Sequence, residues 1–144
     1  MLHYDNINAD PTLEARDDAL ALVDSFLEAS SFAHIKGKAL RDFASAMAKL
    51  PYSQKNDVFY QLCETDSPLT IKKMRLSGPT PAEQIRCVFW QKVLKSYELN
   101  INLDSANPAY FSAFGDSTLD ELRRDAQHFD PDFARFAFGD GPQR

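Results

Sequence analysis

The chain has 144 residues, an ordinary apolar fraction of 44% and a formal net charge of −5. This length suits one domain, residues 1–144, which can bury roughly two-thirds of its unfolded surface without disulfides or metals. No apolar run approaches the roughly 20 residues of a membrane helix and no basic-then-apolar leader is visible, so we expect a cytoplasmic protein without a membrane segment.

The apolar residues favour helices over strands. Leu, Ala and Met total 35 residues, whereas the β-branched residues Val and Ile total 9. Straight-chain and small side chains suit helices, and β-branched ones suit strands. We therefore predict an all-α fold: a single compact domain of six to seven helices, with frayed ends at about residues 1–9 and 139–144.

Start and stop signals place seven helices. In chain order they cover about residues 11–29, 32–50, 53–63, 69–76, 81–97, 117–129 and 131–138. The clearest start is that of the fifth helix, where Thr80 can cap, Pro81 can open the first turn and Glu83 can reach back to the cap. Asp10 and Asp130 each precede a proline and are predicted to cap the first and last helices in the same way.

The fifth helix is predicted to be the centre of the fold. Its apolar positions cover an arc of roughly 200°, so it must be packed on several sides. They are Ile85, Cys87, Phe89, Trp90, Val93, Leu94 and Tyr97. Arg86 falls inside this arc, and we expect it to reach solvent or to pair with a carboxylate. The alternative is an internal charged site.

The two cysteines, Cys63 and Cys87, sit next to apolar residues in helical patterns. We expect two buried thiols, with a disulfide or redox pair as the alternative. The last third of the chain is rich in aromatic residues, and we expect these to pack back on the core. The alternative there is an aromatic docking surface.

Charge is segregated along the chain. Residues 1–35 carry seven acids and one base, residues 36–95 five acids and eleven bases, and residues 96–144 nine acids and four bases. The first helix concentrates this pattern, because five carboxylates fall within an arc of roughly 120°. They are Glu14, Asp17, Asp18, Asp24 and Glu28. Opposite them, the predicted apolar face consists of Leu13, Ala19, Leu20, Leu22, Val23, Phe26 and Leu27.

Two interpretations of the acidic residues stay open. Like charges three or four residues apart cost a few tenths of a kcal/mol each in a helix. Lys38, Arg41 and Lys49 of the second helix could neutralise them from within the fold, because consecutive helices are usually neighbours. Alternatively, the acidic residues face a partner with a basic surface.

No residue pattern points to catalysis, a cofactor or a metal. His128 lies three residues after Asp125 and near Asp132, but a metal site needs three or four converging ligands. With only five glycines, the chain has no glycine-rich phosphate loop. We therefore expect no catalytic, cofactor-binding or metal-binding residues, and no enzyme.

The sequence is typical of a small non-enzymatic protein that binds a macromolecular partner stoichiometrically, such as an adaptor, inhibitor, immunity-type protein or accessory regulator. The expected partner is a protein, and the five acidic residues are the expected contact. The alternative is a nucleic-acid-binding accessory protein that uses the basic segment 36–95. Its candidate basic patch consists of Lys36, Lys38, Arg41, Lys49, Lys72, Lys73 and Arg75.

Overall fold

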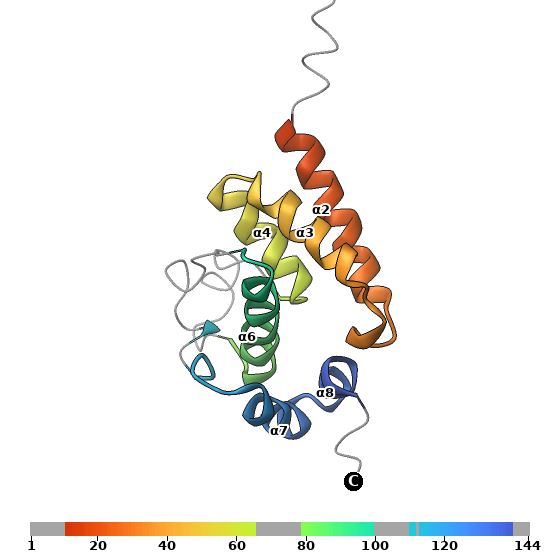
Figure 1. Ribbon diagram of the computed structural model, residues 1–144. Coiled ribbons are helices and arrows are strands. Elements are labelled where there is room, and N and C mark those ends of the chain that lie inside the picture. The colour runs from red at the N-terminus through yellow and green to blue at the C-terminus, as the bar shows by residue number, and fades with distance from the viewer. Residues whose placement is uncertain (1–10, 66–78, 100–109, 112, 140–144) are drawn as a thin grey trace, which may run out of the picture.

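The structure is a computed structural model that describes residues 11–65, 79–99, 110–111 and 113–139 (Figure 1). Within these ranges it contains six α-helices, one 3-10 helix and no strand, which confirms the predicted all-α fold. The elements are α2 (Pro11–Glu28), η1 (Phe32–His34), α3 (Gly37–Ala48), α4 (Tyr52–Leu62), α6 (Pro81–Ser96), α7 (Leu119–Phe129) and α8 (Pro131–Phe138). The helix predicted at 69–76 and, apart from Gly139, both predicted frayed ends lie outside the described residues.

The helices form an upper group and a lower group in the view of Figure 1. In the upper group α2 packs against both α3 and α4, and the three helices run up and down in alternation. In the lower group α6 packs against α7, α7 packs against α8, and α8 reaches η1 beneath the end of α2. The turn after α2 therefore connects the two groups.

Helix α6 is the centre of this arrangement, as the sequence predicted. Its buried apolar residues include Ile85, Cys87, Val88, Phe89, Trp90 and Leu94. The Trp90 ring stacks on Phe26 of α2 at a centroid distance of 6.0 Å and meets Phe136 of α8 at 6.2 Å. Side chains from both groups of helices thus meet on α6.

The predicted cap of α6 is present with both of its hydrogen bonds. The Thr80 hydroxyl accepts from the Glu83 backbone N–H at 3.2 Å, and a Glu83 carboxylate oxygen accepts from the Thr80 backbone N–H at 2.8 Å. Asp130 caps α8 by accepting from the Phe133 N–H at 3.3 Å. These bonds satisfy backbone donors that the first turn of a helix leaves free.

The second predicted helix was wrong at its beginning. The chain forms η1 at Phe32–His34, passes through extended backbone at Lys36 (φ −74°, ψ 146°) and begins α3 only at Gly37. Local side-chain bonds compete with the helix here, because the hydroxyls of Ser30 and Ser31 lie 2.8 and 3.1 Å from the His34 Nδ1. The Phe32 ring also packs edge-on against α6, which holds the turn in place.

The predicted apolar face of α2 was partly wrong. Leu13 and Leu27 are 56% and 40% exposed, while Ala15, which was not predicted to be buried, is only 4% exposed. The core instead uses a narrow row spaced four, four and three residues apart, which is the contact row of a helix packed between two neighbours. This row is Ala15, Ala19, Val23 and Phe26.

Both cysteines are free and buried, as predicted. Burial raises the pKa of the Cys63 thiol well above its usual range, and the neighbouring Cys87 thiol raises it further. The aromatic residues of the C-terminal third follow the prediction in part: Tyr110 and Phe111 are buried, whereas Phe129 is 45% exposed.

Candidate partner-binding face

The five acidic residues of α2 all lie on the surface. Each is exposed, and none forms an ion pair with another residue that the structure describes. We call this set, Glu14, Asp17, Asp18, Asp24 and Glu28, the acidic face. The five carboxylates give the face a formal charge of −5.

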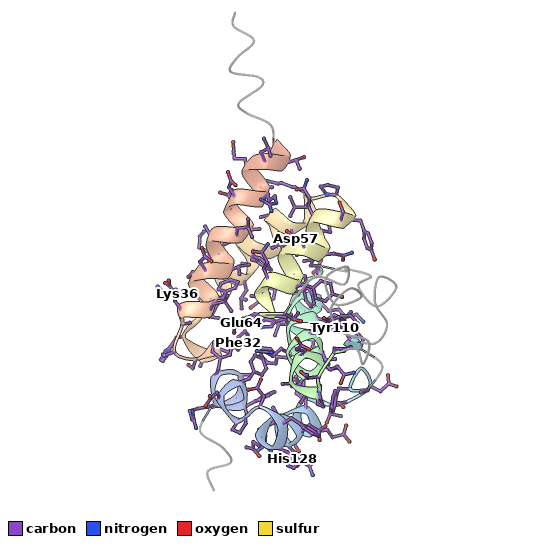
Figure 2. All side chains as sticks on the ribbon, turned by 180° about the vertical axis from the view of Figure 1, so that it is seen from behind. Phe32, Lys36, Asp57, Glu64, Tyr110 and His128 are labelled. Carbon is purple, nitrogen blue, oxygen red and sulfur yellow. The ribbon has the colours of Figure 1, made fainter. Side chains whose placement is uncertain are left out.

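The single base of α2 does not neutralise the acidic face. The Arg16 guanidinium lies 3.4 Å from a carboxylate oxygen of Asp57 on α4, the residue that Figure 2 marks. Both side chains are partly exposed, so this pair adds little to stability. The ion pair nevertheless affects the charge distribution of α2, because it holds the only positive charge of that helix on the side that faces α4.

On α7 and α8, by contrast, an exposed acid is paired with a base of the same helix. On α7, Asp120 contacts both Arg123 and Arg124, and the Arg123 guanidinium holds the pKa of that carboxyl below its usual range. On α8, Asp132 pairs with Arg135 at 3.3 Å. These are the i,i+3 and i,i+4 pairs that commonly offset surface charge on a helix. Helix α2 has no such pair.

A groove between α2 and α3 lies beside part of the acidic face. It has a volume of about 470 Å³ and is lined by Glu14, Ala15, Asp18, Ala21, Leu22, Asp42, Ser45, Ala46 and Lys49. The small side chains leave room in the middle, and three carboxylates border it. Asp42 of α3 is a carboxylate that the sequence analysis did not assign to this site, because only the packing of the two helices brings it near Glu14.

The basic residues of the second predicted helix do not pair with the acidic face. Helices α2 and α3 are neighbours, as internal neutralisation requires. However, the ammonium of Lys38 binds Asp42 of its own helix at 2.8 Å. Among the described residues, neither Arg41 nor Lys49 forms an ion pair with α2, although Lys49 is the one base that lines the groove.

The candidate basic patch is only partly described. Lys36, Lys38, Arg41 and Lys49 are all exposed on α3 and its flanks (Figure 2 marks Lys36). Lys72, Lys73 and Arg75 lie outside the described residues. The structure therefore places four of the seven bases on one helix and its ends.

The described residues bring no metal-binding group together. Nowhere in this part of the chain do three His, Cys, Asp or Glu side chains converge as metal ligands would. His128, which Figure 2 marks, contacts the ring of Phe129 edge-on, with a centroid distance of 4.6 Å. No helix in the same part of the chain combines the length and apolar character needed to cross a membrane.

Comparison of the chain with protein-family models, with curated proteins and with solved structures finds no match.

Proposed function

We propose that this chain is a small non-enzymatic protein that binds a macromolecular partner stoichiometrically through the acidic face, as an adaptor, inhibitor, immunity-type protein or accessory regulator. The expected partner is a protein with a basic surface. One observation supports this proposal above others: five exposed carboxylates share one helix, and none is paired with another described residue.

Folding gives no reason for this arrangement. The core uses the opposite side of α2, so exposed Gln, Ser or Lys residues would support the same packing. The pairs Glu14/Asp18 and Asp24/Glu28 are spaced four residues apart, and each such pair destabilises the helix by a few tenths of a kcal/mol. A basic partner removes this repulsion on binding and is steered toward the face while still at a distance.

The groove between α2 and α3 gives the partner a place to dock. Glu14 and Asp18, which have no ion pair with a described residue, border it from α2, so a lysine or arginine side chain entering the groove meets two available carboxylates there. On the α3 side it meets Asp42, whose carboxylate it would share with Lys38. Lys49 at the same groove would repel a base placed at its end and thereby restrict the position of the partner.

The test is the double reversal Asp17→Lys with Asp24→Lys. Its matched control is Glu98→Lys with Asp116→Lys, which changes the net charge equally at two exposed acids outside α2. The partner is first captured from the native host with the wild-type chain, and its association rate is then measured by surface plasmon resonance at several salt concentrations.

We expect the α2 variant to stay folded, to associate at least about tenfold more slowly and to lose the salt dependence of association, while the control behaves like the wild type. Equal association of both variants would overturn the proposal. Retention on heparin or DNA that disappears when Lys38 and Arg41 become Glu would instead favour the nucleic-acid alternative.

A further inference from the structure

A second pocket, separate from the acidic face, lies where the ends of α2 and α4 meet α6 and α8. Its volume is about 390 Å³, which is within the usual range of small-molecule sites. Both aromatic and charged side chains line it. The aromatic residues that matter here are Trp90, Phe133 and Phe136, and the charged ones are Glu64, Arg86 and Asp130.

Arg86 contributes to this pocket a positive charge that is only weakly paired. Its side chain is 21% exposed, and its Nε lies 3.8 Å from an Asp130 carboxylate oxygen. Pairing with a carboxylate is one of the two outcomes expected for Arg86, but the distance is too long for a hydrogen bond. The Nε atom is buried and has no hydrogen-bond partner. Because the Nε itself is buried, a ligand in the pocket meets the accessible part of the Arg86 side chain, whose only ion pair with a described residue is this long one.

Asp130 is the complementary group. Its side chain is 19% exposed. One carboxylate oxygen accepts from the Phe133 backbone N–H and fixes the side chain at the start of α8, while the other faces Arg86. Glu64, just after α4, is an exposed second carboxylate that lines the same pocket (Figure 2 marks Glu64). A cation and acidic groups therefore stand side by side in one pocket.

These charges restrict the class of ligand. The pocket is lined by one base, Arg86, and three acids, Glu64, Asp130 and Asp132. A simple anion would be repelled by the acids, and a simple cation would be repelled by Arg86. A zwitterion answers both charges at once, and an apolar substituent on it can lie against the half-buried rings of Phe133 and Phe136.

We propose that this pocket binds a free α-amino acid with an apolar or aromatic side chain. The ligand carboxylate accepts from Arg86, its ammonium group donates to Asp130, and its side chain packs on Phe133 and Phe136. This inference rests on the pocket alone and is independent of the partner proposed for the acidic face.

The single tryptophan of the chain gives a direct readout, because Trp90 lines this pocket. Its fluorescence is followed while the protein is titrated with L-phenylalanine or L-leucine. Phenethylamine, which lacks the carboxylate, and 3-phenylpropionate, which lacks the ammonium group, are the matched comparison ligands. We expect a saturable change with both amino acids and at least about tenfold weaker binding of both analogues, because each loses a charge-assisted hydrogen bond.

Two substitutions locate the binding. Arg86→Gln and Asp130→Asn should each weaken phenylalanine binding at least about tenfold. Asp130→Asn removes the charge but keeps the cap of α8, since Asn caps as well as Asp. The control is Arg124→Gln, an exposed arginine of α7 that pairs with Asp120 outside the pocket and should leave binding unchanged.

Several results would overturn the proposal: no saturable change with either amino acid, equal binding of phenethylamine and phenylalanine, or wild-type binding by Asp130→Asn. If Arg86→Gln does not fold, as judged by circular dichroism, the analogues and Asp130→Asn decide the question. Amino-acid binding should persist in the Asp17→Lys, Asp24→Lys variant, so this proposal and the partner proposal can fail separately.

Discussion

Replacing Phe89 with Ala tests whether α6 is the centre of the core. Phe89 is 3% exposed, and its ring meets four other aromatic rings edge-on at centroid distances of 5.3–5.5 Å. Removing a buried phenylalanine ring costs about 3–5 kcal/mol, including the cavity that is left. For a chain of this size each kcal/mol lowers the melting temperature by about 2–4 °C, so we expect a fall of about 6–20 °C.

The assay is thermal and urea unfolding followed by far-UV circular dichroism. The matched control is Phe129→Ala, because the same side chain is 45% exposed there and should cost only about 1 kcal/mol. Because the loss expected for Phe89→Ala is large enough to unfold a marginal domain, Phe89→Leu, which keeps much of the apolar volume, serves as a milder variant. If Phe89→Ala and Phe129→Ala lowered the melting temperature equally, the core would not be centred on α6.

Two further predictions concern titratable groups. Because Cys63 and Cys87 are buried and the pKa of the Cys63 thiol is raised, neither should react with a disulfide reagent at neutral pH until guanidinium unfolds the chain; prompt reaction of the folded protein would contradict this. In Arg123→Gln, the pKa of the Asp120 carboxyl, read by NMR titration, should rise toward its ordinary value of about 3.9. A carboxyl with a depressed pKa stabilises the fold above its unfolded pKa and loses that contribution as the pH falls through the folded pKa. The part of the acid sensitivity that comes from Asp120 should therefore be smaller in the variant. An unchanged Asp120 titration would contradict the assignment of Arg123 as the cause.

Local signals predicted the beginnings of α6 and α8. The residues that cap these helices lie within three positions of the backbone groups they bind, so the sequence contains the whole motif at Thr80–Glu83 and at Asp130. The beginning of α3 could not be found in this way. It depends on the ring of Phe32, which packs on residues of α6 more than fifty positions later in the chain.

The positions of the five acidic-face residues were also predictable from the sequence, but the packing of the opposite side of α2 was not. Helical periodicity alone places its five residues on the side of α2 away from the core, and all five are exposed. Periodicity could not show which apolar residues of the opposite side are covered. Which of these residues are covered depends on how far α3 and α4 extend along α2, and Leu13 near the start of α2 is left exposed.

Neither the groove between α2 and α3 nor the pocket lined by Arg86 could be predicted from the sequence. The groove needs Asp42 from α3 beside Glu14 from α2, and this proximity follows from helix packing. Arg86 was expected to reach solvent or to pair with a carboxylate. Nothing in its spacing points to Asp130, which approaches only because α7 turns the chain back toward α6.

The aromatic contacts of Trp90 also bear on how quickly the protein folds. Trp90 is stacked by Phe26 from near one end of the described chain and met by Phe136 from near the other. Individual helices form within about a microsecond, but contacts between such distant segments need large loops to close, which slows folding relative to simple helical bundles. On the ribosome, Trp90 can meet Phe26 as soon as α6 has emerged, but the contact with Phe136 forms only after α8 has followed, so the side of α6 that α8 covers is the last part of the core to close.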